Sequence, residues 1–244
     1  MHRLQTTRAS EPINVSCSPS FAMFWLTLRL GSFYSAYPHM ALRIVGDSDR
    51  IDPARMAQEN IAAAIRFGPI DAHNLKSIEL FEEWLVPVAT PAFLESHPDI
   101  RSPTDLIGTH LLHAGDPWEG TDATEEWASW LQSVGVPATP LLLRQGTQFN
   151  HSLLSMQAAL GGQGIAMGHL ALVLKYLRDG RLVVPFRKRV HMQWSYSLMG
   201  SAVQDESAIV IDWLLDEARQ FKEQRDDFFA EHHIMIAAQN ADAR

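Results

Sequence analysis

The first regular pattern in the chain runs from Ile13 to Pro38 and combines two periods. Apolar and polar residues alternate over 13–18, which predicts a half-buried strand. Apolar residues then recur at steps of three and four over 21–37, which predicts an amphipathic helix. Proline in Ser18-Pro19-Ser20 suits a first helical turn, either serine can cap the free backbone N–H groups, and Pro38 ends the helix.

A strand that leads into a hydroxyl-lined helix N-terminus is suited to hold an anion or a carboxylate. The free N–H groups and the helix dipole both favour negative charge there. The simpler interpretation is that both serines only cap the helix, because most capped helices bind nothing.

The rest of the pattern alternates short apolar strands with helices, which is typical of parallel sheets with helices packed on them. Strands are predicted at 41–45 and 62–68, with a helix between them that begins at Asp52-Pro53. A second unit follows, with predicted strands at 84–90, 111–113, 141–143, 165–167 and 182–185. A strand at 194–199 and an amphipathic helix at 206–229 complete the pattern, and 237–244 is expected to fray.

Composition and charge narrow the class of protein. The 244 residues, 46% of them hydrophobic, allow one large or two small soluble domains. The formal charge of -8 argues against direct DNA binding by this chain, since nucleic-acid binders carry basic patches. A single cysteine suits a reducing cytoplasm. The apolar run at 21–30 is too short for a bilayer and contains Arg29, so neither a membrane span nor a signal peptide is expected.

The sequence carries no catalytic or metal-binding signature. Its eleven histidines are scattered without HExxH or CxxC spacing, so we expect no metal and no cofactor. There is no GxSxG elbow, but a serine hydrolase stays open because catalytic triads are assembled in space. Gly161-Gly162-Gln163-Gly164 follows a helix and precedes a strand, the reverse of a phosphate-binding fingerprint, and so indicates a helix C-terminus.

A set of short stretches also follows one another in a recognisable order. They are Ser18-Pro19-Ser20-Phe21-Ala22, Trp25-Leu26, Leu30-Gly31-Ser32-Phe33, Tyr37-Pro38, 50–54, 64–68, 85–91, 101–106, 127–131, 162–166 and 180–186. Their order and spacing, from about Ile13 to Phe221, resemble the effector-binding domain of LysR-type transcriptional regulators. The resemblance is strongest to the subgroup with the glycine-cleavage activator and the chromosomal β-lactamase regulator.

The resemblance implies an α/β fold of two Rossmann-like subdomains joined by two crossover strands, like type 2 periplasmic binding proteins. Subdomain I would hold 12–86 and 192–229, and subdomain II would hold 87–191. Residues 1–11 would be a disordered tail and 230–244 a C-terminal tail. The crossovers would be the apolar strands at 85–90 and 194–199, and a small molecule would bind in the cleft between the subdomains.

The resemblance also implies ligand-binding residues, position by position. They are Ser18, Ser20, Asp52, Arg66, Asn150, His151, Ser152 and Tyr196. The two serines of the first helix N-terminus would face Ser152, with its two neighbours, across the cleft. Each remaining position also has a simpler interpretation: a helix cap for Asp52, an interdomain ion pair for Arg66 and packed core for Tyr196.

Two departures from the family bear on function. The family carries an N-terminal winged helix-turn-helix and a linker helix, whereas this chain begins a dozen residues before its first predicted strand. We therefore expect the DNA-reading element to be absent from this chain. In the family, DNA would be contacted only through that winged helix-turn-helix. An acidic residue found in the family is replaced by alanine within Asn60–Ala64, which affects the identity of the effector.

The sequence thus predicts a non-enzymatic, cytoplasmic sensor that binds a small anionic effector and forms oligomers, most simply a dimer. The alternatives are a solute receptor of the periplasmic type, which shares the architecture, and a serine hydrolase. A degenerate protein that dimerises with intact regulators and blocks them is a further alternative.

Overall fold

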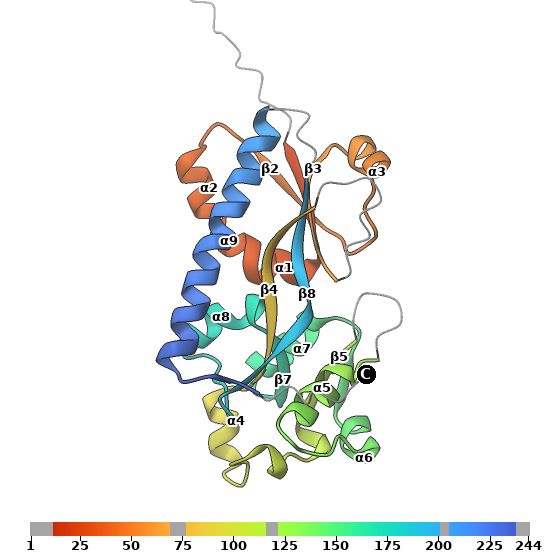
Figure 1. Cartoon of the computed structure of the whole chain (residues 1–244), viewed down its shortest axis with the longest axis vertical. Helices are drawn as coiled ribbons and strands as arrows, with labels where there is room; N and C mark the ends of the chain where they lie inside the picture. Colours follow the sequence, from red (N-terminus) through yellow and green to blue (C-terminus); the bar gives the residue numbers. More distant parts are fainter. Residues whose placement is uncertain (1–11, 69–76, 116–121, 201–204, 238–244) are drawn as a thin grey trace, which may run out of the picture.

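The computed structural model describes residues 12–68, 77–115, 122–200 and 205–237. Its strands follow the order β2-β1-β3-β8-β4-β7-β5-β6, with β9 added beside β8. Helices cover this path of strands, and the long helix α9 runs along the molecule (Figure 1).

The first half of the molecule is built on three parallel strands. Its elements are β1 (Ile13–Cys17), α1 (Pro19–Phe21), the π-helical turn η1 (Ala22–Leu26), the 3-10 turn η2 (Thr27–Arg29), α2 (Leu30–Ala36), β2 (Leu42–Gly46), α3 (Pro53–Gln58) and β3 (Ile61–Phe67). Strand β1 pairs in parallel with β2 and β3, so the carboxyl ends of the three strands lie at one edge. The predicted first helix is confirmed as one helical run, although its hydrogen bonding changes from α to π to 3-10 along the way.

Two long strands join the halves. They are β4 (Ser77–Val88) and β8 (Lys188–Gly200), which pair antiparallel with each other. Strand β8 also pairs with β3 of the first half, and β4 pairs with β7 of the second half. The two strands run side by side between the halves in Figure 1, so the predicted crossovers at 85–90 and 194–199 are confirmed, although both strands begin earlier and β4 ends at Val88.

The second half repeats the parallel arrangement. Its elements are α4 (Pro91–Ser96), η3 (Pro103–Asp105), η4 (Gly108–His110), β5 (Leu111–Ala114), α5 (Glu125–Ser133), α6 (Pro140–Arg144), β6 (Thr147–Phe149), α7 (Ser152–Leu160), β7 (Ile165–His169) and α8 (Leu170–Arg178). Strand β5 pairs in parallel with β6 and β7.

Two strand predictions in the second half are wrong. Residues 141–143 lie in helix α6, because the Thr139 hydroxyl caps the helix by accepting from the Leu142 N–H at 3.2 Å and Pro140 occupies its first turn. This cap chemistry outweighs the apolar run that suggested a strand. The segment 182–185 forms only an isolated bridge, between Val183 and Ala89.

The C-terminal part of the chain is more ordered than expected. Helix α9 (Asp205–Glu231) ends two residues beyond its prediction, and β9 (Met235–Ile236) pairs in parallel with Lys188 and Arg189 of β8. Ala237, expected to fray, is buried, and its N–H donates to the Arg189 carbonyl at 2.8 Å. Residues 230–237 therefore pack on the molecule, while the expected tails at 1–11 and 238–244 lie outside the described residues.

The largest buried cluster joins the two halves. Phe21 stacks on Trp25 with ring centres 4.8 Å apart, and Phe81 of β4 contacts Phe221 of α9 in a tilted arrangement at 4.5 Å. Tyr176 of α8 meets Phe24 of η1 edge to face at 5.7 Å, so a helix of the second half packs on the first half. Each such side chain contributes roughly 1.5–3 kcal/mol through burial.

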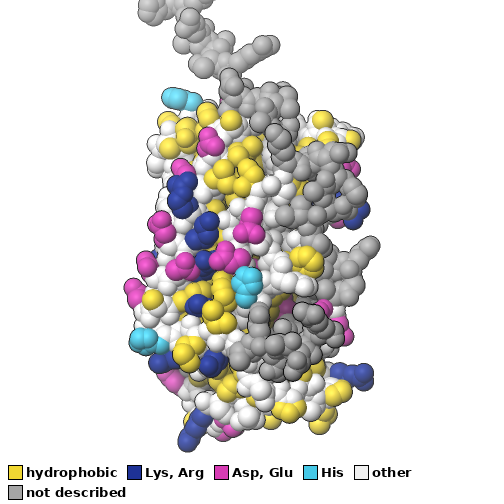
Figure 2. Space-filling model, in the orientation of Figure 1, with side chains coloured by type: hydrophobic (Ala, Val, Ile, Leu, Met, Phe, Trp, Pro, Cys, Tyr) yellow, Lys and Arg dark blue, Asp and Glu magenta, His cyan; other side chains and the backbone are white. Residues whose placement is uncertain are grey.

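The surface over α9 is of mixed charge. Figure 2 shows acidic and basic side chains interspersed along this helix, and among them Arg219 pairs with Asp216 at 2.9 Å. Alternating signs give no extended basic face there of the kind that binds nucleic acid. In the part of the chain that the structure describes, no helix is both long and apolar enough to cross a membrane.

Candidate functional site

Two helix N-termini from opposite halves meet at a pair of serines. Ser20 lies in α1 and Ser152 is the first residue of α7, and their hydroxyl oxygens are 2.9 Å apart. The two residues are 132 positions apart in sequence, and Ser20 is only 8% exposed. Because the first N–H groups of each helix lack intrahelical acceptors, two positively polarised helix ends face each other here.

The neighbouring residues explain why Ser20 faces its partner. Ser18 is the N-cap of α1, and its hydroxyl accepts from the Phe21 N–H at 3.2 Å. This leaves the Ser20 hydroxyl to point across to the second half. On the other side, His151 precedes α7 in an extended conformation without a capping side-chain bond, and both Asn150 and His151 are exposed.

Tyr196 lies behind Ser20 and is packed among aromatic rings. Its ring centre is 4.8 Å from that of Phe21 and 4.9 Å from that of Phe67, and the residue is 4% exposed. The body of the tyrosine is therefore core, as its simpler interpretation predicts. Phe21 directly follows Ser20 in the sequence, so this aromatic cluster adjoins the residue that makes the serine contact.

Asp52 and Arg66 do not join the serine pair. The Asp52 carboxylate caps α3 by accepting from the Arg55 N–H at 2.8 Å. The Arg66 guanidinium donates to the Asp49 carbonyl at 3.0 Å and to the Ser16 hydroxyl at 2.9 Å. Asp49, Ser16 and Arg55 all lie in the first half, so these contacts of Asp52 and Arg66 stay within one half of the molecule.

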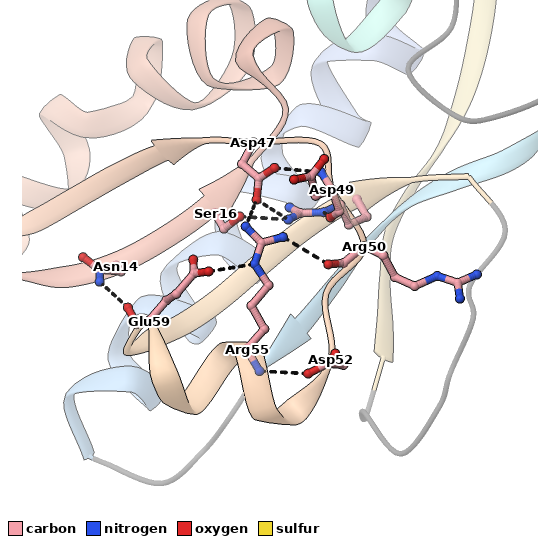
Figure 3. Close-up of polar contacts among 9 residues, drawn as sticks. Asn14, Ser16, Asp47, Asp49, Arg50, Asp52, Arg55 and Glu59 are labelled. Atoms are coloured by element: carbon pink, nitrogen blue, oxygen red, sulfur yellow. Dashed lines mark hydrogen bonds and ion pairs between the residues drawn. The ribbon is translucent and has the colours of Figure 1, made fainter.

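Arg66 belongs to a polar network at the carboxyl ends of β1, β2 and β3. Asp47 accepts from Arg55 and lies 3.5 Å from the Arg66 guanidinium, and Arg55 also pairs with Glu59 at 2.9 Å (Figure 3). Burial lowers the pKa of Arg66, and Asp47 opposes this effect. The network holds the segment between β2 and α3 against the carboxyl ends of the three strands.

A second cluster of ionisable groups was not predicted from the sequence. Glu83 of β4 is 1% exposed, and its carboxylate accepts from the Trp84 N–H at 2.8 Å and the Ala171 N–H at 3.2 Å. His169 at the end of β7 contacts Glu126 of α5, with Nε2 and Oε1 2.7 Å apart. The available signal was that Glu83 shares the buried face of its strand with Phe81 and Leu85, at a spacing of two.

Other chemistry is limited in the described part of the chain. No group of three or more histidine, cysteine or acidic side chains within it is placed to hold a metal ion. Burial raises the pKa of the Cys17 thiol to about 12, so this cysteine is an unreactive core residue.

Comparison with known proteins places this arrangement in context. A family profile described as LysR substrate binding domain matches residues 7–220. The glycine cleavage system transcriptional activator of Escherichia coli K12 is 34% identical over 185 residues, which cover 75% of this chain and 56% of that protein. The HTH-type transcriptional activator AmpR of Pseudomonas aeruginosa is 28% identical over 221 residues, which cover 89% of this chain and 70% of that protein. This chain thus spans about half the length of the glycine cleavage activator.

Solved structures agree with the sequence comparison. The effector domain of AmpR from Pseudomonas aeruginosa matches with a TM-score of 0.69 and 28% identity, over 89% of this chain and 99% of that one. The AmpR effector binding domain from Citrobacter freundii matches with a TM-score of 0.68 and 25% identity, over 86% and 99%. The expected α/β fold, with two Rossmann-like subdomains and periplasmic-binding-protein-like crossovers, is therefore confirmed.

Proposed function

Because this chain belongs to the LysR substrate-binding domain family, we propose that it is the effector-sensing part of a LysR-type transcriptional regulator. The effector is a small anion that binds between the N-termini of α1 and α7. The observation that carries this proposal is the contact of the Ser20 and Ser152 hydroxyls, at 2.9 Å, across the two halves.

The chemistry of the serine pair favours a carboxylate. Each hydroxyl now shares one hydrogen bond with the other, and an entering carboxylate accepts from both. Hydrogen bonds to a charged group contribute about 1.5–3 kcal/mol each, compared with about 1 kcal/mol for a neutral pair. The exchange is favourable, and the helix ends add to it because their dipoles attract negative charge.

Entry of the anion also changes the relation of the two halves. The hydroxyls are in direct contact, so a carboxylate fits between them only when α1 and α7 separate. The crossover strands β4 and β8 are the hinge about which this separation takes place. The effector then selects one angle between the halves, and a whole regulator transmits this angle to DNA through its oligomer and its DNA-binding domain.

We further propose that the protein acts without catalysis and in the cytoplasm, and the names of its relatives as transcriptional activators support this proposal. The serines bind the effector and do not attack it. Covalent labelling of Ser20 or Ser152 by a serine-directed phosphonate would contradict this statement and favour a hydrolase.

The test is a thermal-shift screen of the full chain against small carboxylates, amino acids and cell-wall peptide fragments. A molecule that binds only the folded state raises Tm in a saturable manner. Ser20→Val and Ser152→Val are expected to weaken binding of each hit by about 10- to 100-fold, since each removes one charged hydrogen bond.

Ser129→Val is the matched control, because Ser129 is an exposed helical serine in α5. It is expected to leave the affinity unchanged. Equal affinity of the wild type, Ser20→Val and Ser152→Val for every hit would refute the serine pair as the site. A folded, cooperative chain with no hit would refute effector sensing and favour a module that binds only protein.

A further inference from the structure

Three ionisable side chains from three elements meet at the boundary of the two halves. They are Glu83 of crossover strand β4, Glu126 of α5 and His169, which ends β7 and precedes α8. The imidazole of His169 lies between the two carboxylates. Its Nε2 is 2.7 Å from Oε1 of Glu126, and its Nδ1 is 3.9 Å from Oε2 of Glu83.

We propose that Glu83, His169 and Glu126 form a proton-binding site, and that uptake of one proton there alters the packing of the two halves at Phe67. The existence of this site does not depend on an effector, and only its influence on effector affinity rests on the proposed function.

The distances around His169 indicate which atoms would bind the added proton. The short contact of Nε2 with Glu126 is an N–H donated to a carboxylate, which leaves Nδ1 directed toward Glu83. The gap of 3.9 Å on that side is longer than a hydrogen bond. One added proton, on Nδ1 or on the Glu83 oxygen, closes the gap with a hydrogen bond between these two atoms. The cluster then carries a charge of about -1 in place of about -2.

The surroundings favour this uptake near neutral pH. Glu83 and His169 are 1% and 6% exposed, and a buried site disfavours the higher charge. Burial raises the pKa of Glu83 to about 7, which His169 and the N–H groups of Trp84, Leu170 and Ala171 partly oppose.

The charged groups on the neighbouring elements have their own partners or are exposed. Glu82, next along β4, pairs with Arg225 of α9 at 2.9 Å, and Lys175 of α8 pairs with Asp179 at 2.5 Å. Glu125 of α5 is exposed, and Arg66 of β3 is held by Ser16 and Asp47. From β8, Tyr196 contacts Phe67, and the exposed His191 lies against Trp84, the residue that follows Glu83. A proton shared by Glu83 and His169 reduces the negative charge that this buried cluster carries.

A continuous row of rings leads from the cluster to the serine pair. The His169 ring meets Phe67 of β3 edge-on, with ring centres 5.3 Å apart. Phe67 contacts Tyr196 at 4.9 Å, and Tyr196 contacts Phe21 at 4.8 Å, directly beside Ser20. Movement of His169 toward Glu83 shifts its contact with Phe67, which belongs to the opposite half.

The test is an NMR titration of the full chain between pH 5.5 and 8.5, with the imidazole signals of His169 assigned by loss in His169→Gln. We expect a transition near neutral pH at His169, and the backbone amides of Phe67 and Phe21 should follow the same midpoint. In Glu83→Gln the His169 midpoint should fall, because one of the two carboxylates that stabilise the charged imidazole is lost. Glu125→Gln, which removes an exposed carboxylate of the same helix, should leave all midpoints unchanged.

Each alternative outcome is decisive. His169 signals that stay constant over this range, or that titrate identically in wild type and Glu83→Gln, would overturn the proton site. A His169 transition that the amides of Phe67 and Phe21 do not follow would overturn the coupling to the opposite half. Because no effector is added, the result is independent of the thermal-shift screen that tests the proposed function.

Discussion

The buried carboxyl group of Glu83 makes the stability of this protein depend on pH in a direction that can be calculated. Burial raises the pKa of Glu83 from an ordinary value of 4.5 to about 7. Between these two values the folded protein binds a proton that the unfolded chain has released. The contribution of Glu83 to the free energy of unfolding is therefore full below about pH 4.5 and is lost as the pH rises through about 7.

The magnitude follows from the size of the shift. Since one pKa unit corresponds to about 1.4 kcal/mol, linkage predicts that this contribution falls by roughly 2.5 kcal/mol between pH 5 and pH 8. Glu83→Gln removes the titrating group and keeps the shape, and its amide oxygen still accepts from the Trp84 and Ala171 N–H groups. The variant should therefore gain about 2.5 kcal/mol relative to wild type between pH 5 and pH 8.

The assay is urea unfolding followed by tryptophan fluorescence and circular dichroism, on wild type and Glu83→Gln at four pH values. Comparing the two proteins at each pH cancels the titration of all other groups that the substitution leaves unchanged. Glu125→Gln serves as the control, because its carboxylate is exposed and should add no pH dependence. If the difference in unfolding free energy between wild type and Glu83→Gln is the same at pH 5 and pH 8, the reasoning is refuted.

Two further predictions concern the polar network and the link between protons and anions. Asp47→Asn should destabilise the fold by about 2 kcal/mol in urea unfolding, because it leaves the guanidinium groups of Arg55 and Arg66 facing each other without their shared carboxylate. The exposed Asp49→Asn should change stability by less than about 0.5 kcal/mol, and equal effects of both variants would contradict this role of Asp47. Sulfate, whose charge is constant between pH 6 and pH 8, should bind more tightly at the lower pH by calorimetry, because a proton on the Glu83 cluster lowers the negative charge near the serine pair. A sulfate affinity that is independent of pH, or that changes equally in Glu83→Gln, would show that the cluster and the serine pair are not coupled.

Local chemistry predicted most of the elements correctly, and its failures have identifiable causes. The alternation at Ile13–Cys17, the Ser18 cap and the Asp52 cap were all visible in the sequence, and the structure has each of them. The prediction at 141–143 failed because a short apolar run fits a strand or a buried helix equally well, and the Thr139 cap decided for the helix. Beyond Glu231, the chain was expected to form a tail. The parallel pairing of β9 with β8 is a long-range contact, which a local sequence pattern cannot predict.

By itself, the sequence determined the repeated β/α order, the positions of the helix caps and the family of the domain, because these depend on neighbouring residues and on their spacing. Only the tertiary structure decided which of the expected site residues meet. Ser20 and Ser152 come together because two crossover strands bring two separate helix N-termini to one place, whereas Arg66 is drawn into the network of its own half. The carboxylates around His169 meet for the same physical reason. Glu83, Glu126 and His169 are far apart in the chain, and only the packing of β4, α5 and β7 removes them from water together and so changes their chemistry.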